Sequence, residues 1–262
     1  MKYTFMRNLS AAELLTAWER ALGQSPVQQA LVLLAAAYPE HSPEQLAQFS
    51  VGQRDACLLT LRERLFGSQL NSVTACPQCQ QRIELVFTVP DIRVEPTMTD
   101  PIAPAGEAMT LTIEGYRVHF RLPNSLDLAS IETITDVNQA REQLLRRCIQ
   151  SVVREGANSD DGEPVNNPTP LPLPLVDAIA ERMAEADAQA DTRLALSCPD
   201  CSHEWRATFD IATYMAAEIY NWVKHILREV HSLARSYGWR EADILAMTPT
   251  RRRAYLELLD HG

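Results

Sequence analysis

Apolar residues in the first 70 positions recur at helical spacing. Ser10 and Glu13 stand three residues apart, the spacing of a capping box, which predicts a helix that starts there. Four apolar residues then fall on one face of that helix: Leu14, Leu15, Trp18 and Leu22. Pro26 suits the first position of a second helix. A later helix, beginning after Ser50, is expected to end at Gly67.

The pattern changes from helical to alternating near residue 72. Alternation of apolar and mostly polar residues over 83–89 predicts a half-buried strand with these inward residues: Ile83, Leu85, Phe87 and Val89. A second alternating stretch, residues 111–122, is interpreted as a hairpin that turns at Glu114-Gly115. Residues 90–108 hold four prolines and little periodicity, so they are predicted to be a loop.

Helical spacing returns after the hairpin. Helices are predicted to begin near Ser125 and near Asp136. The second is expected to contain five apolar residues: Leu144, Leu145, Cys148, Ile149 and Val152. Residues 156–174 are rich in Gly, Asn, Asp and Pro and are interpreted as a flexible linker. A helix over about 174–186 is predicted to follow.

The C-terminal part is predicted to be helical from Ile211 onward. A long helix is expected to end at Gly238, with Tyr237 and Trp239 packing across that turn. A short helix over residues 240–246 follows. Thr248 and Pro249 are predicted to cap a last helix that ends near Leu259.

Two C-P-x-C sequences stand out, Cys76-Pro77-Gln78-Cys79 and Cys198-Pro199-Asp200-Cys201. They form a weak internal repeat, because the apolar positions after the first pair match those after the second, as Phe87 matches Phe209. Each copy is therefore interpreted as one small unit of strand, metal knuckle and strand.

The four cysteines Cys76, Cys79, Cys198 and Cys201 predict one structural zinc site. A C-x-x-C turn lets two thiolates reach one ion, and zinc accepts four cysteines in tetrahedral structural sites. Since each knuckle supplies only two ligands, the copies are expected to join in a zinc ribbon that is discontinuous in sequence. Other readings stay open: a pair of disulfides, two half-sites completed by a partner chain, a ligand role for His203, or redox chemistry.

These patterns predict an α+β fold, mostly helical, with a discontinuous four-cysteine zinc ribbon and an additional β-hairpin. The predicted division runs as follows: an N-terminal helical region (1–70), the first ribbon half (71–92), an inserted hairpin and helices (93–155), a linker (156–174), a helix (175–192), the second ribbon half (193–211) and a C-terminal helical region (212–262).

Length and charge narrow the class of protein. The chain has 262 residues, enough for a substantial core, and a formal net charge of −10, which argues against broad contact with bare nucleic acid. The N-terminus shows no secretory signal, and the longest apolar run, residues 30–38, is too short to span a bilayer. We therefore expect a cytoplasmic protein that meets other proteins, with Cys57 and Cys148 as buried core thiols.

The sequence offers no recognisable catalytic motif. It contains no G-x-S-x-G, Walker loop or H-E-x-x-H, and carboxylates such as Glu218 and Glu229 are typical of solvated helix faces. The chain is therefore interpreted as a non-enzyme without a small-molecule substrate. The dense basic patch Arg251-Arg252-Arg253 is interpreted either as a solvated face or as a contact for an acidic protein surface.

The C-terminal stretch from Glu229 to Leu245, with Tyr237-Gly238-Trp239, and the segment from Pro249 to Leu256 resemble the end of a known family. This is the T-even-phage-type baseplate hub assembly chaperone family, in the versions found with phage-tail-like contractile injection systems. Further similar positions are Gly52-Gln53-Arg54-Asp55, Leu61-Arg62-Glu63, Phe66-Gly67, both cysteine pairs and Phe209-Asp210-Ile211. Ala216-Ala217 depart from the family, which often has a large aromatic residue there.

The resemblance implies a structural or assembly protein of the baseplate or hub of a contractile tail or injection particle. Its partners would be baseplate or hub proteins, and its incorporation into the finished particle is left open. The alternative is a zinc-ribbon adaptor in another complex, with nucleic acid contacted through the arginine cluster. Partner contact is expected at Tyr237, Trp239, Arg251, Arg252 and Arg253, because Tyr, Trp and Arg dominate binding hot spots. Arg252 and Arg253 are expected to be exposed.

Overall fold

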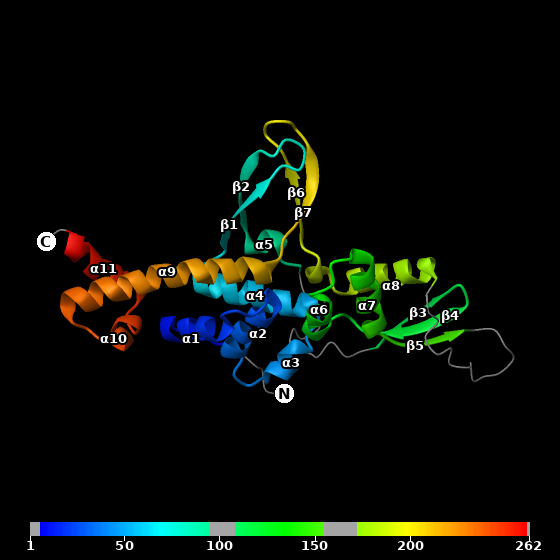
Figure 1. Ribbon diagram of the computed structural model, residues 1–262, viewed down its shortest axis with the longest axis horizontal. Coiled ribbons are helices and arrows are strands. Elements are labelled where there is room, and N and C mark those ends of the chain that lie inside the picture. Colours follow the sequence, from blue (N-terminus) through cyan, green and yellow to red (C-terminus); the bar gives the residue numbers. More distant parts are fainter. Residues whose placement is uncertain (1–5, 95–107, 155–171, 261–262) are drawn as a thin grey trace. The chain divides into compact units, whose positions relative to one another are not determined.

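The computed structural model describes residues 6–94, 108–154 and 172–260, and most of them are helical (Figure 1). The α-helices are α1 (Ala11–Ala21), α2 (Pro26–Ala37), α3 (Pro43–Ala47), α4 (Val51–Phe66), α5 (Val89–Ile92), α6 (Ser125–Ile131), α7 (Val137–Cys148), α8 (Leu173–Ala186), α9 (Ile211–Tyr237), α10 (Glu241–Leu245) and α11 (Pro249–Asp260). The strands are β1 (Gln69–Ala75), β2 (Arg82–Thr88), β3 (Met109–Ile113), β4 (Tyr116–Phe120), β5 (Ile149–Arg154), β6 (Arg193–Ser197) and β7 (Glu204–Thr208). Within the described residues they form three antiparallel sheets, β1-β2, β3-β4-β5 and β6-β7. The predicted α+β, mostly helical class is confirmed.

The contacts divide the chain into two compact units. The first comprises Met1–Pro43, Thr60–Ser68 and Asp210–Gly262, and the second comprises Glu44–Leu59 and Gln69–Phe209. Helix α4 is continuous and contributes residues to both units. The seven-part division expected from the sequence stays a prediction.

The first unit is helical, and the 27-residue helix α9 is its longest element. Ser10 accepts a hydrogen bond from the Glu13 amide and closes the predicted capping box of α1. Helix α9 buries residues at amphipathic spacing and ends at Gly238, whose φ of 70° is left-handed. Its buried residues are Ile211, Ala212, Met215, Ile219, Val223, Ile226, Val230 and Leu233. Leu22 does not join the apolar face of α1 as predicted; it is 56% exposed because the helix ends at Ala21.

The predicted hairpin is one part of a three-stranded sheet in the second unit. Strands β3 and β4 turn at Glu114-Gly115, where φ is 51° and 76°, as a tight hairpin requires. Ile149 and Val152, predicted to be helical, lie instead in β5, which pairs with β4. A two-stranded hairpin leaves an open edge and is marginally stable, so pairing with this β-branched segment is preferred to one more helical turn. The sheet and two helices share a buried cluster: Val118, Phe120, Leu145, Ile149, Val152, Leu175 and Ile179.

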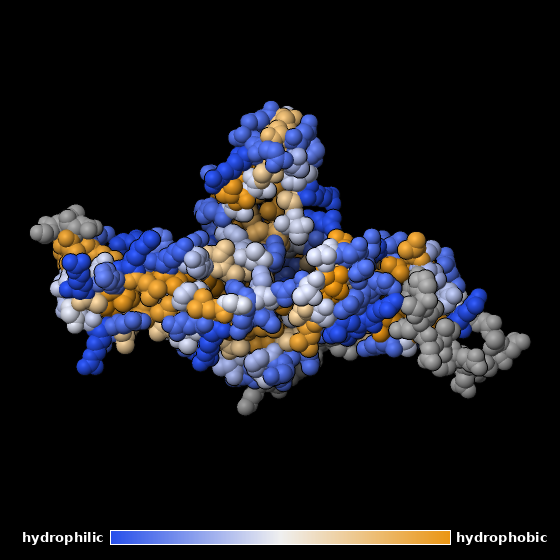
Figure 2. All heavy atoms as spheres, in the orientation of Figure 1, coloured by the Kyte–Doolittle hydropathy of each residue, from blue (hydrophilic) through white to orange (hydrophobic). Residues whose placement is uncertain are grey.

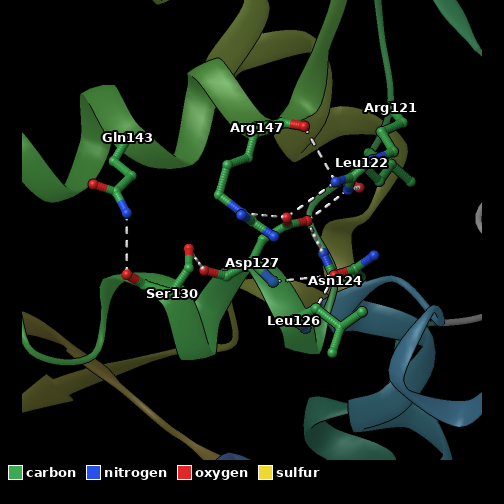
Figure 3. Close-up of polar contacts among 8 residues, drawn as sticks. All are labelled: Arg121, Leu122, Asn124, Leu126, Asp127, Ser130, Gln143 and Arg147. Atoms are coloured by element: carbon green, nitrogen blue, oxygen red, sulfur yellow. Dashed lines mark hydrogen bonds and ion pairs between the residues drawn. The ribbon is translucent and has the colours of Figure 1, made fainter. Parts of the chain in front are cut away.

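A buried carboxylate of α6 is linked to α7 and to the residue that follows β4 (Figure 3). Asp127 is fully buried and accepts hydrogen bonds from the guanidinium groups of Arg121 and Arg147 and from the Asn124 amide, at 2.5–3.0 Å. Burial alone would raise the pKa of Asp127, but these donors outweigh it and lower the pKa below its usual value. Asn124 in turn caps α6 by accepting from the Leu126 and Asp127 amides.

A second carboxylate, that of Asp187, lies at the N-terminus of α4. Its oxygens accept from the Gly52 amide at 2.9 Å and from the Ser50 hydroxyl at 3.0 Å. A Cβ atom on Gly52 would lie 2.1 Å from Asp187 Oδ1, so a larger residue could not be placed here without movement. Burial raises the pKa of Asp187, against the opposing effects of Gly52, Ser50 and the charge of Arg54.

The segment after β2 differs in part from its prediction. Val89 begins helix α5 and does not extend the strand. The helix forms because Thr88 and Asp91 make a capping box, with the Thr88 amide donating to Asp91 at 2.7 Å, and because Pro90 is tolerated in a first turn. Most of the predicted loop (90–108) and most of the predicted linker (156–174) lie outside the described residues. Helix α8 begins at Leu173, within the last residues of the predicted linker.

Candidate metal centre

Two antiparallel hairpins of the second unit carry the four cysteines. Strand β1 pairs with β2 and β6 with β7, and each C-P-x-C sequence forms the turn between its strands. Figure 1 shows the two hairpins side by side. The repeat of strand, knuckle and strand that the sequence predicted is therefore present twice.

The two turns have the same backbone hydrogen bonds. The amides of Cys76 and Cys198 each donate to the carbonyl oxygen five residues later, at 2.9 Å in both turns. The amides of Gln80 and Ser202 donate back to the carbonyl oxygens of these cysteines, at 2.9 and 3.0 Å. Gln80 and Ser202 also share a left-handed φ, 63° and 59°, which costs a non-glycine residue about 1–2 kcal/mol. Both turns hold the same local strain, a frequent feature of functional sites.

These turns bring four sulfur atoms together. The Sγ atoms of Cys76, Cys79, Cys198 and Cys201 all lie within 4.8 Å of one another. The distance between Cys76 and Cys201 is 3.7 Å, and that between Cys79 and Cys198 is 3.6 Å. Four thiolates bound tetrahedrally at about 2.3 Å from one zinc ion would be about 3.8 Å apart. The cysteines are thus close enough to hold a metal ion, and both the sulfur donors and their spacing fit zinc.

Disulfides do not account for this cluster. All six cysteines are free thiols, and Cys57 and Cys148 are buried as predicted. A disulfide bond is about 2.05 Å long, well below the two cross-hairpin sulfur distances. His203 is not in the cluster that the described residues form; its ring stacks on Trp205 with centroids 5.9 Å apart.

The electrostatics of the cluster favour a cation. Burial opposes ionisation of Cys76, but hydrogen bonds from the Cys79 and Gln78 amides outweigh it and lower the pKa of Cys76 to about 7. For Cys79, the Gln81 amide favours the thiolate, but burial and the neighbouring sulfurs raise the pKa to about 12. Ionisation of one thiol thus makes ionisation of its neighbour less favourable, because negative charges within a few ångströms repel one another. A bound cation would remove that repulsion.

The two hairpins also meet through aromatic rings. The rings of Phe87 and Phe209 lie edge to face with centroids 5.3 Å apart. Leu70 of β1 is fully buried, and five further apolar strand residues are half-buried: Ile83, Leu85, Leu194, Leu196 and Trp205. Isolated two-stranded sheets are marginally stable by themselves. The cysteine cluster therefore gives the two hairpins a link in addition to this ring contact.

The C-terminal residues expected to bind a partner lie in the first unit. Tyr237 stacks on Trp239 with centroids 4.4 Å apart, which confirms the predicted packing across Gly238. Tyr255 of α11 completes the aromatic cluster, with centroids 4.8 Å from Trp239 and 5.8 Å from Tyr237. Arg251 lies over the Tyr255 ring at 5.8 Å. All three rings are half-buried, so part of their surface faces solvent.

The three adjacent arginines do not share one face. Arg251 and Arg253 are exposed, but the expectation that Arg252 is exposed is wrong: the residue is 3% exposed. Its Nε donates to Glu229 Oε2 at 2.9 Å, and its Nη1 donates to the Met247 carbonyl at 2.6 Å. Consecutive helical residues point about 100° apart, so when α11 packs on α9 only the central arginine turns inward.

The sequence reasoning missed the roles of several charged residues. Glu218, interpreted as part of a solvated face, accepts from Arg62 Nε at 3.0 Å and Nη2 at 2.8 Å. The guanidinium of Arg62 also lies 5.9 Å from the centre of the Tyr214 ring. Asp187 was likewise interpreted as part of a solvated face, but its carboxylate accepts from the Gly52 amide and the Ser50 hydroxyl. The signal for this contact is Gly52, because a glycine lets another group approach the backbone closely.

None of the described helices combines the length and the apolar composition needed to cross a membrane.

The comparisons with known proteins identify the family. The family model described as "T4 bacteriophage base plate protein" matches residues 11–216. That range contains all four cysteines of the cluster. The C-terminal stretch from Glu229 to Leu256, whose sequence most resembles the baseplate hub assembly chaperone family, follows the matched range. Searches of the curated proteins and of the solved structures gave no match. Because the match covers well over half of the 262 residues, the chain belongs to the T4 bacteriophage base plate protein family.

Proposed function

We propose that this chain is a non-enzymatic structural or assembly protein of a baseplate or its hub, in a contractile tail or a tail-like injection particle. The observation that carries this proposal is the family match over residues 11–216. The same range includes both knuckles, so a metal-linked ribbon would be part of the family region.

We further propose that Cys76, Cys79, Cys198 and Cys201 bind one structural zinc ion. Four protein sulfurs fill a tetrahedral shell and leave no open position for a substrate or for water, which is the usual distinction between structural and catalytic zinc. The ion would supply a cross-link between the hairpins. Metal analysis of protein purified without added zinc should give about one equivalent per chain; two equivalents, or iron, would contradict this assignment.

A partner surface is proposed at the C-terminal corner. The exposed Arg251 lies over the half-buried ring of Tyr255, which in turn meets the rings of Tyr237 and Trp239, and Arg253 is exposed elsewhere on the same helix. Tyr, Trp and Arg are the side chains that are enriched in binding hot spots. Arg252 is not part of this surface, because its guanidinium is engaged by Glu229.

The assembly role can be tested by deleting the gene and examining the particles by electron microscopy. We expect baseplates to be absent or incomplete, and we expect the wild-type gene to restore them. Complementation with Arg251→Glu tests the corner separately, because Arg251 is exposed and lies over the Tyr255 ring. Arg182→Glu, an exposed helical arginine of the second unit, provides a control of equal charge change. Normal particles in the deletion strain would refute the proposed function. Normal particles with Arg251→Glu would refute only the proposed partner surface at the corner.

A further inference from the structure

The outward face of α9 carries a stripe of basic residues. Lys224, Arg228, His231 and Arg235 follow the spacing i, i+4, i+7 and i+11, which places them along one side of the helix. All four are exposed, and the buried residues of α9 lie on the opposite side. We call these four residues the basic stripe.

The acidic residues of α9 do not balance this stripe. All of α9 lies in the described part of the chain, and its two acidic residues are Glu218 and Glu229. Each pairs with an arginine whose side chain is almost fully buried, Glu218 with Arg62 and Glu229 with Arg252. The exposed face of α9 is therefore basic in a chain whose net charge is −10. Solvated helices usually mix both signs of charge, which improves solubility and adds local pairing.

Apolar side chains border the stripe. Tyr220 is 49% exposed and Leu227 is 41% exposed, and each precedes a stripe residue by four positions, Tyr220 before Lys224 and Leu227 before His231. The Lys224 ammonium lies 4.1 Å from the centre of the Tyr220 ring, a cation–π contact that orders both side chains at the surface. Figure 2 shows hydrophilic and apolar residues adjoining one another along α9. Basic groups next to exposed apolar groups are features of a protein interface.

We infer that the basic stripe, with Tyr220 and Leu227, binds an acidic protein surface that also offers an apolar contact. The inference rests on the proposed function, under which that surface belongs to another baseplate component. A protein partner is favoured over nucleic acid for two reasons. The stripe holds only three permanent charges on a chain of net charge −10, and nucleic-acid sites need many phosphate contacts. Exposed Tyr and Leu side chains beside it suit a protein interface better than a phosphate backbone.

The test is a charge reversal of the stripe in the full chain. Lys224→Glu with Arg228→Glu removes two exposed positive charges and adds two negative ones. Arg82→Glu with Arg206→Glu makes the same change of net charge on the outer faces of the two hairpins, where both arginines are exposed. Each baseplate protein encoded alongside this one is purified separately, and its affinity for wild type and both variants is measured at low and at high salt. Melting temperatures and circular dichroism establish that all three chains are folded.

We expect the stripe variant to bind one acidic component about tenfold or more weakly, mainly through slower association, while the hairpin control binds like wild type. Wild-type binding should weaken with salt, and that dependence should be smaller in the stripe variant. Restored binding after an acidic residue of the partner is changed to lysine would support the inference directly.

Other outcomes would overturn it. Equal affinity of wild type and stripe variant for a captured component would refute the stripe and leave the proposed function intact. Capture of no component by wild type would refute both. A stripe that binds a short DNA duplex, with no loss of protein binding on charge reversal, would assign the surface to nucleic acid.

Discussion

Replacing Gly52 by alanine should destabilise the second unit, although alanine is the better helix former. A Cβ atom at this position would lie 2.1 Å from Asp187 Oδ1 and 2.7 Å from its Cγ, with the Ala190 amide nitrogen at 3.0 Å. The carboxylate must therefore move away. It then loses the hydrogen bonds from the Gly52 amide and the Ser50 hydroxyl.

The magnitude follows from these contacts. A hydrogen bond to a charged group contributes about 1.5–3 kcal/mol, so losing two costs about 3–6 kcal/mol. The higher helix propensity of alanine offsets about 1 kcal/mol of this loss in the free energy of unfolding. The net loss in the free energy of unfolding is therefore about 2–5 kcal/mol, measured by urea titration with the slope of the transition checked for two-state behaviour. Gly238→Ala is a useful contrast: nothing lies near its Cβ position, and the cost of about 1–2 kcal/mol would come from its left-handed φ alone.

A double-mutant cycle makes this reasoning refutable. In an Asp187→Ala background the obstructing carboxylate is gone and the contact with the Ala190 amide nitrogen at 3.0 Å remains, so Gly52→Ala should lose most of its cost and become close to neutral. The size of the Gly52→Ala effect should thus depend on residue 187. Equal destabilisation in both backgrounds would show that the glycine is needed for another reason.

Three further predictions concern other parts of the chain. Cys198→Ser should lower the melting temperature much more than Cys148→Ser, because the first removes a proposed metal ligand and the second costs about 1–3 kcal/mol as a buried thiol-to-hydroxyl change; equal shifts would contradict the metal site. Asp127 has a lowered pKa in the folded state, so the stability it contributes should be present above about pH 4 and be lost as the pH falls further. Acid titrations of unfolding should show that Asp127→Asn lacks this component, and an unchanged pH profile would refute the assignment. Arg252→Ala should cost about 1–3 kcal/mol, through the lost Glu229 bond, while Arg253→Ala should stay within about 0.5 kcal/mol by the same urea assay, and similar values would count against the packing described for α11.

Local signals in the sequence predicted much of the fold. The capping box at Ser10, the turn at Glu114-Gly115 and the left-handed Gly238 each fix an element boundary through a few neighbouring residues. The repeat after Cys76 and Cys198 predicted both hairpins, because strand alternation is readable within seven residues. These features need no knowledge of distant parts of the chain.

Long-range contacts determine what the sequence did not reveal. Ile149 and Val152 continue a helical spacing, and only the open edge of β4 makes them a strand. Arg252 looks like its two neighbours in sequence, and only the packing of α11 on α9 turns it inward. Asp187 meets Gly52 across 135 positions, a pairing that no periodicity could indicate.

The separation of the two knuckles in the sequence also sets an order of events during synthesis. Cys79 and Cys198 are 119 positions apart, so at about 5–20 residues per second the second knuckle leaves the ribosome about 6–24 s after the first. During this interval the first hairpin offers two thiols with no partner in its own chain. On one polysome, first hairpins of neighbouring nascent chains could share a metal ion and join two chains wrongly. Slower translation between the knuckles would lengthen that exposure, whereas the β3-β4-β5 sheet, encoded between them, can form before the cysteine cluster closes.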